Sequence, residues 1–129
     1  MSKSMIDKAL ENACDTKVCV IGEGVLAQVP EIFREQFEGA ADALVICDPR
    51  TQAAAGNRVA ALLKDAGVAV REHVLEPGGQ TLHADYRYAE EVRAAIRQTT
   101  AGSDGRTVVP VAVGSGVVND LTKFASGEL

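Results

Sequence analysis

Short apolar runs alternate along the chain with longer segments in which apolar residues recur every three or four positions. The runs predict strands, and the longer segments predict amphipathic helices. The four predicted strands are Lys17–Ile21, Ala43–Cys47, Val68–Leu75 and a run that starts at Thr107. A repeated strand-helix order favours a mostly parallel sheet with helices on both faces. We therefore predict a Rossmann-like α/β fold that occupies residues 1–129 as one domain.

The last strand-helix unit is the most informative stretch of the chain. Its apolar run stops at Gly114-Ser115-Gly116, and Val117, Leu121 and Phe124 then follow at helical spacing. The two glycines let the backbone approach a bulky anion, and the free N–H groups of the following helix point toward that anion. The unit therefore predicts a phosphate or diphosphate site, although a glycine turn can also serve only to reverse the chain.

Polar side chains follow this turn at offsets of three and four residues. Asn119, Asp120 and Lys123 therefore share one face just inside the predicted helix. That face could carry polar contacts to other groups of the same ligand.

An earlier glycine pair follows the first predicted strand. The motif Gly22-x-Gly24-x-x-Ala27 fits the dinucleotide fingerprint, and Asp48 lies at about the expected distance downstream. However, Pro30 would interrupt a helix that ran on from Gly24, whereas it fits the first position of a helix over residues 31–38. We therefore interpret this pair as a structural turn rather than a phosphate cradle.

The second predicted strand, Ala43–Cys47, is uninterrupted and apolar, which favours a central parallel strand. Asp48-Pro49 ends it, and Thr51 is a plausible cap for a helix to Ala66 with Ala54, Ala55, Val59, Leu62 and Leu63 inward. An acidic residue in the place of Asp48 can accept hydrogen bonds from the hydroxyls of a ribose. It can equally do no more than shape an Asp-Pro turn.

Two further segments lie nearer the edges of the predicted fold. Val68–Leu75 alternates in part, so we expect a strand near a sheet edge with His73 pointing outward. A helix is predicted from about Asp85 to Thr99, with Tyr88, Val92, Ala95 and Ile96 inward, and a polar loop follows it. Pro110 cannot donate to a sheet ladder, so the last strand should pair only from Val111 onward or contain a bulge.

Composition excludes several classes of protein. A net charge of −5 and the lack of a long basic run argue against nucleic-acid binding. No signal-peptide pattern or 18-residue apolar stretch occurs, so we expect no membrane association and a cytoplasmic protein. Three cysteines and two histidines, His73 and His83, show no metal-binding spacing.

The string VAVGSGVVNDLTKFAS closely resembles the glycine-rich motif of the sn-glycerol-1-phosphate dehydrogenases, typically AVGSGxxNDLTKxxA. These enzymes belong to the superfamily of iron-containing alcohol dehydrogenases, glycerol dehydrogenases and dehydroquinate synthases. The segments IGEGVLAQVPE and DPRTQAAAGNRVAALLKDAG also resemble that family. The NDLTK string argues for the glycerol-phosphate branch and against a dehydroquinate synthase-like lyase.

The resemblance implies that this chain matches the amino-terminal, NAD(P)-binding half of the family. It implies that Asp48 contacts the ribose and, through its charge, favours NAD(H) over NADP(H). It further implies a role for Asp120 and Lys123 in binding substrate. The other cofactor-binding residues that it implies are Gly114, Ser115, Gly116, Val117, Val118, Asn119 and Asp120.

In that family a following helical domain holds a divalent metal (zinc, nickel or iron) through an aspartate and two histidines. The full enzyme exchanges a hydride between glycerol-1-phosphate and dihydroxyacetone phosphate. Because the sequence stops at Leu129, just past the glycine motif, we expect a cofactor-binding half that has no metal ligands or catalytic residues and is inactive alone. Its partner would be a missing or separately encoded metal-binding domain. The alternative is a stand-alone nucleotide-binding or interaction module.

Overall fold

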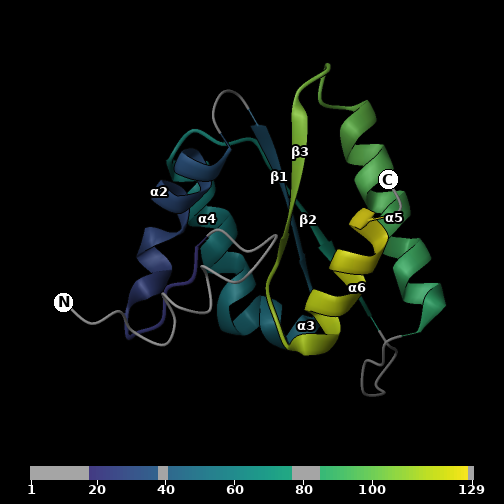
Figure 1. Ribbon diagram of the computed structural model, residues 1–129, viewed down its shortest axis with the longest axis horizontal. Coiled ribbons are helices and arrows are strands. Elements are labelled where there is room, and N and C mark those ends of the chain that lie inside the picture. The colour runs from purple at the N-terminus through teal and green to yellow at the C-terminus, as the bar shows by residue number, and fades with distance from the viewer. Residues whose placement is uncertain (1–17, 38–40, 77–84, 128–129) are drawn as a thin grey trace.

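The computed structural model describes residues 18–37, 41–76 and 85–127 and shows a parallel sheet between two layers of helices (Figure 1). The strands are β1 (Ala41–Cys47), β2 (Val70–Val74) and β3 (Thr107–Ala112). The α-helices are α2 (Val29–Gln36), α3 (Pro49–Thr51), α4 (Asn57–Asp65), α5 (Tyr86–Ala101) and α6 (Gly116–Gly127). A short 3-10 helix, η1 (Val25–Gln28), precedes α2, and a π-helical segment, η2 (Gln52–Gly56), joins α3 to α4. This architecture confirms the predicted Rossmann-like α/β fold.

The strands lie in the order β2-β1-β3, and both pairs are parallel. Residues 42–47 of β1 are all buried, which confirms the prediction that the uninterrupted run Ala43–Cys47 forms a central strand. The predicted strand Val68–Leu75 corresponds to β2, which lies at an edge of the described sheet as expected.

Alternate side chains of β1 fill two separate cores. Leu44 and Ile46 face α5 and α6, whereas Ala43 and Val45 face α2 and α4. The alternation follows from the period of two in a strand. As a result β1 is covered on both faces and paired along both edges.

Pro110 pairs in register with Leu44, and β3 continues without a bulge from Thr107 to Ala112. Both predicted options, a bulge and pairing that starts only at Val111, are therefore wrong. The N–H of Val113 donates to the carbonyl of Ile46 at 2.8 Å. Because successive backbone N–H groups alternate sides, those of Val111 and Val109 also face β1, and the nitrogen of Pro110 faces the other edge. The missing donor therefore removes no bond to β1.

Residues 18–21 do not form the predicted first strand. Val18, Val20 and Ile21 are 39, 42 and 75% exposed, so this apolar run is not buried and has no neighbour in the described sheet. The interpretation of the following glycines as a turn is confirmed. Gly24 has a left-handed φ of 67°, and η1 and then α2 follow, with Pro30 in the first turn of α2.

The segment after β1 differs from the prediction in its cap and its inward face. Asp48, not Thr51, is the N-cap residue, and helical structure then runs continuously from Pro49 to Asp65. Val59, Ala60 and Leu63 are the buried residues of α4. Of the predicted inward residues outside this set, Ala54 is exposed, and Ala55 and Leu62 are only partly buried.

The predicted helix near residues 85–99 is α5, and its buried residues include all four predicted inward ones, Tyr88, Val92, Ala95 and Ile96. Its first turn is capped by Asp85, whose Oδ1 accepts from the N–H of Arg87 at 2.9 Å. His73 does not simply point into solvent, because its Nε2 lies 3.1 Å from Oε1 of Glu91 on α5. His83 lies outside the described residues.

An ion pair joins the amino end of β1 to the segment before β3. Arg106 donates from Nε to Oδ1 of Asp42 at 2.9 Å and from Nη2 to Oδ2 at 3.2 Å. These bonds, together with one from Ser103, hold the pKa of Asp42 below its usual value. The stabilisation is therefore present above the unfolded pKa, near 4, and is lost as the pH falls through the lower folded pKa.

Among the described residues, no helix is long and apolar enough to cross a membrane. Nor does that part of the chain gather three His, Cys, Asp or Glu side chains as a metal centre would require.

Candidate functional site

Asp48 and the Gly114-Ser115-Gly116 turn follow neighbouring strands at the carboxyl edge of the sheet, where α3 and α6 begin (Figure 1). The chain leaves β1 toward α4 on one face and leaves β3 toward α6 on the other. Neighbouring strands whose connections diverge in this way leave a crevice between their carboxyl ends, where open α/β sheets bind ligands. The structure thus places the two predicted parts of the site on neighbouring strands at the same edge of the sheet.

Gly114 lies where the Gly114-Ser115-Gly116 turn packs against the segment that follows β1. A Cβ atom built on it would lie 2.8 Å from Cγ2 of Val118 and 3.3 Å from Cγ2 of Thr51. The first of these distances is shorter than any ordinary carbon contact. A glycine here therefore allows the turn to lie against both the start of α6 and the helix that follows β1.

Gly116 has a different environment from Gly114. It is exposed, and a Cβ atom built on it would have no described heavy atom within 4 Å outside the backbone of its own helix. Gly116 is not among the described glycines whose backbone φ is positive. Neither strain nor internal packing therefore requires glycine at this position, and the space beside it is open to a ligand.

The first turn of α6 supplies donors next to this open space. The N–H of Asn119 is already bonded to the carbonyl of Ser115 at 3.1 Å. The N–H groups of Gly116, Val117 and Val118 precede it and have no partner within the helix by geometry. Because the side chain of Val118 is fully buried, only its backbone is placed to contact a ligand.

Asp48 shapes the turn at its own position. Its Oδ1 accepts from the N–H of Thr51 at 2.8 Å and from Oγ1 of Thr51 at 3.1 Å, while the N–H of Asp48 donates to Oγ1 of Thr51 at 3.0 Å. The bonds to the carboxylate all reach Oδ1, and no donor in the described part of the chain reaches Oδ2. The carboxylate is half-buried, so capping leaves one of its oxygens open to a further contact.

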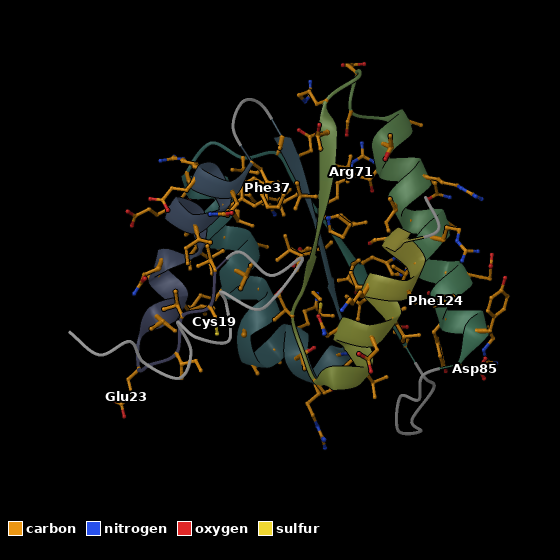
Figure 2. All side chains as sticks on the ribbon, viewed as in Figure 1. Cys19, Glu23, Phe37, Arg71, Asp85 and Phe124 are labelled. Carbon is orange, nitrogen blue, oxygen red and sulfur yellow. The ribbon has the colours of Figure 1, made fainter. Side chains whose placement is uncertain are left out.

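The predicted polar face on α6 is present. Asn119, Asp120 and Lys123 are all exposed and continue from Gly116 along the outer side of the helix. Beside Asp120 lies an apolar pocket of about 310 Å³, lined by Asp85, Tyr86, Ala89, Asp120, Leu121 and Phe124. Figure 2 labels Phe124 on α6 and Asp85 at the start of α5, and the centroids of the Tyr86 and Phe124 rings lie 6.4 Å apart in an edge-to-face arrangement. Our sequence analysis did not predict this pocket.

Sequence reasoning also missed the close packing of Gly56 against Cys47, the residue that precedes Asp48. Cys47 is fully buried, and its burial, together with the nearby carboxylates of Glu72 and Asp48, raises the pKa of its thiol. A Cβ atom on Gly56 would lie 3.2 Å from Cys47 Sγ. A glycine in the middle of an otherwise helical segment was the available signal of this close approach.

Comparison with known proteins identifies the family of this chain. Residues 20–129 match the family model described as iron-containing alcohol dehydrogenase. The chain belongs to that family. The glycerol-1-phosphate dehydrogenase [NAD(P)+] of Halalkalibacterium halodurans is 35% identical over 107 residues, which cover 82% of this chain and 25% of the relative.

These matches confirm the resemblance that was inferred from the glycine-rich motif and support the assignment to an oxidoreductase family. The match covers only part of the relative. This member of the iron-containing alcohol dehydrogenase family spans about a quarter of the length of its relative.

Proposed function

We propose that this chain is the cofactor-binding half of a glycerol-1-phosphate dehydrogenase-like oxidoreductase and binds NAD or NADP. The observation that carries the proposal is the open space at Gly116, beside N–H groups that have no partner within α6 and at the same edge of the sheet as Asp48. The family match supplies the reaction class, and the matched relative is an NAD(P)+ enzyme.

The residues present fit a dinucleotide. A diphosphate beside Gly116 would accept hydrogen bonds from the N–H groups of Gly116, Val117 and Val118, and its charge would favour the helix start. A ribose at the end of β1 would donate to Oδ2 of Asp48, which the cap leaves available. Ser115 would lie against the phosphates within the same turn. The bound cofactor would supply the hydride acceptor.

The polar face of α6 would extend this site toward the substrate. Asn119 and Asp120 lie one turn beyond Gly116, and Lys123 lies one turn further. An exposed ammonium group suits a phosphorylated substrate, and an aspartate suits a hydroxyl group. A separate metal-binding domain would supply the divalent metal that polarises the substrate oxygen.

Titration calorimetry of the purified chain with NAD+ and NADP+ tests the cofactor role. We expect weak, saturable binding with a dissociation constant on the order of 1 mM, because the chain spans about a quarter of the length of its relative and each contact that it does not supply costs about 1 kcal/mol. NAD+ should bind more tightly than NADP+, because the Asp48 carboxylate repels a 2′-phosphate. No saturable binding at millimolar cofactor would overturn the proposal.

The isolated chain should not oxidise NADH in the presence of dihydroxyacetone phosphate, even with added divalent metal. The polarising metal needs ligands from the other domain. Turnover is monitored by the loss of NADH absorbance. Measurable turnover by the purified chain would contradict the proposal that catalysis needs a separate metal-binding domain.

A further inference from the structure

Thr51 lies close to both parts of the candidate site. Its hydroxyl group accepts from the N–H of Asp48 at 3.0 Å, and the N–H of Thr51 donates to Oδ1 of Asp48 at 2.8 Å. Its methyl carbon, Cγ2, would lie 3.3 Å from a Cβ atom built on Gly114. This half-buried side chain therefore links the end of β1 to the glycine turn that follows β3.

The hydroxyl group of Thr51 also orients the carboxylate of Asp48. A threonine hydroxyl has a single proton to donate. Its oxygen lies 3.1 Å from Oδ1 of Asp48 and 3.3 Å from the carbonyl oxygen of the same residue. We assign the donated bond to Oδ1, which is the nearer acceptor and belongs to a charged group. Oδ1 then accepts two bonds from Thr51, which limits rotation of the carboxylate and leaves Oδ2 for a ligand.

The backbone at Thr51 is held independently of its hydroxyl group. The N–H of Gln52 donates to the carbonyl of Asp48 at 2.8 Å, and helical structure continues through η2 into α4. At the end of η2, a Cβ atom on Gly56 would lie 3.2 Å from Cys47 Sγ. A substitution at Thr51 that preserves its size should therefore remove the hydroxyl bonds to Asp48 and leave the path of the chain unchanged.

We propose that Thr51 is a positioning residue for cofactor recognition, because its hydroxyl group holds the Asp48 carboxylate with Oδ2 directed to the ribose. The inference rests on the proposed function, in which Asp48 binds the ribose. A carboxylate that is held in place accepts from a 2′-hydroxyl group and repels a 2′-phosphate. A carboxylate that rotates freely does both less well, so Thr51 determines the preference for NAD+ over NADP+ without a contact to either cofactor.

Two substitutions separate the hydroxyl group from the methyl group. Thr51→Val removes the hydroxyl group and keeps Cγ2, whereas Thr51→Ser keeps the hydroxyl group and removes Cγ2. Titrations of the isotope-labelled chain with NAD+ and with NADP+, followed by NMR at constant ionic strength, give the two dissociation constants and their ratio. We expect Thr51→Val to reduce the preference for NAD+ by about three- to tenfold. Thr51→Ser should retain the preference of the natural chain within about twofold.

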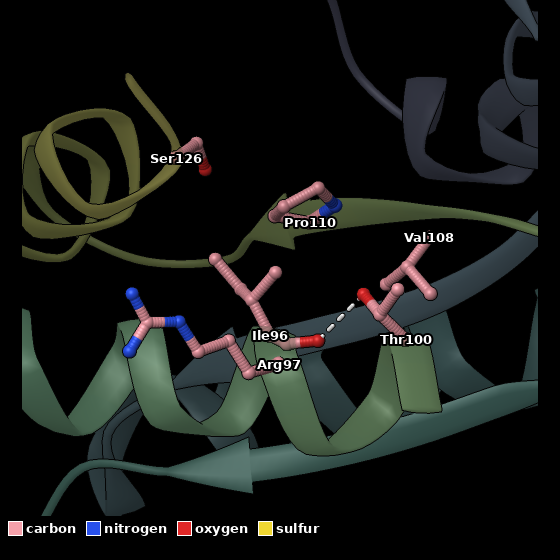
Figure 3. A pocket seen from close by; sticks show the side chains of 6 residues that line it. All are labelled: Ile96, Arg97, Thr100, Val108, Pro110 and Ser126. Carbon is pink, nitrogen blue, oxygen red and sulfur yellow. Dashed lines mark hydrogen bonds between the residues drawn. The ribbon is translucent and has the colours of Figure 1, made fainter. Parts of the chain in front are cut away.

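Thr100→Val is the matched control, because it makes the same exchange of hydroxyl for methyl at a distant site. Thr100 donates to the carbonyl of Ile96 at 2.8 Å beside a pocket of about 470 Å³ (Figure 3). Val108 lines the same pocket and pairs with Asp42, at the opposite end of β1 from Asp48. The cofactor preference should therefore be unchanged in Thr100→Val. An unchanged preference in a folded Thr51→Val protein would overturn the inference, and so would an equal loss in Thr51→Ser. If Thr51→Val does not fold, Thr51→Ala removes the same hydroxyl group.

A double-mutant cycle tests whether Thr51 acts through Asp48. In the Asp48→Asn background there is no carboxylate to hold, so adding Thr51→Val should change the remaining preference by less than about twofold. A further reduction as large as that in the natural background would mean that Thr51 acts by another route, and the inference would fail.

Hydrogen exchange of the free chain tests the premise without a cofactor. The amide of Asp48 donates to the Thr51 hydroxyl group, so it should exchange about tenfold faster in Thr51→Val than in Thr51→Ser. Equal rates would remove the structural basis of the inference. Absence of cofactor binding by the natural chain would overturn the proposed function and the inference together. A natural chain that prefers NAD+ and a Thr51→Val variant with the same preference would overturn the inference alone.

Discussion

The two segments with glycine-x-glycine spacing have different structural roles. In the first, exposed residues precede the turn, and Gly24 is needed for its left-handed φ of 67°. In the second, a paired strand precedes the turn, Gly114 packs tightly against Val118, and Gly116 borders open space. The spacing of the glycines is the same in both, and their place relative to the sheet differs.

This difference shows what makes a glycine turn a candidate anion site. A turn that only reverses the chain needs glycine for its backbone angle. A turn that receives a ligand has a glycine between a strand end and a helix start, at a position where neither the backbone angle nor the packing of the protein requires one. Gly116 meets the second description, and Gly24 meets the first.

The largest loss of stability is expected for Gly114→Val. Its Cβ atom would lie 2.8 Å from Val118, and overpacking of this kind costs about 1 to 3 kcal/mol. The melting temperature should therefore fall by roughly 5 to 10 °C. Thermal denaturation followed by circular dichroism measures this. Adding Val118→Ala should recover part of the loss, and an unchanged melting temperature in the single variant would contradict the packing role.

A smaller loss is expected for Gly24→Ala. The left-handed backbone angle costs a residue with a Cβ atom about 1 kcal/mol, although a Cβ atom there meets no described heavy atom within 4 Å. The melting temperature should fall by roughly 3 to 6 °C, and cofactor affinity per folded molecule should be unchanged. Gly24→Asn is the control, since asparagine tolerates this angle better. Loss of cofactor binding in a fully stable Gly24→Ala variant would instead favour the dinucleotide fingerprint.

Asp48→Asn should change stability very little, because asparagine is as good an N-cap as aspartate. Removal of the charge should nevertheless reduce the preference for NAD(H) over NADP(H). Asp48→Ala serves as the control for the cap and should cost about 1 kcal/mol. Titration of both cofactors against each variant gives the preference. An unaltered preference in Asp48→Asn would leave Asp48 with its capping role alone.

Local patterns in the sequence were sufficient to predict the strand, turn and helix that carry the candidate site. The apolar run, the glycine turn and the helical spacing after Gly114 each act within a few residues, and a strand (β3) and a helix (α6) flank the turn as predicted, although the pairing of β3 at Pro110 differs. The exposed face of Asn119, Asp120 and Lys123 likewise followed from helix periodicity alone.

The errors concern features that depend on distant parts of the chain. The apolar run at residues 18–21 could have formed a strand only if a neighbouring strand had been available to pair with it. Pro110 is tolerated because its nitrogen faces away from β1, which depends on strand order. The choice of Asp48 over Thr51 as the cap depends on the backbone angle at the end of β1, since both residue types can cap.

The measurement that tests the central claim most directly is the pair of melting temperature and cofactor affinity on Gly116→Val. The account predicts an almost unchanged melting temperature, because a Cβ atom at this position meets only open space. It also predicts the loss of saturable binding of NAD+ at millimolar concentration, because the side chain would occupy the place of the diphosphate. A Gly116→Val protein that binds NAD+ as tightly as the natural chain would contradict the account.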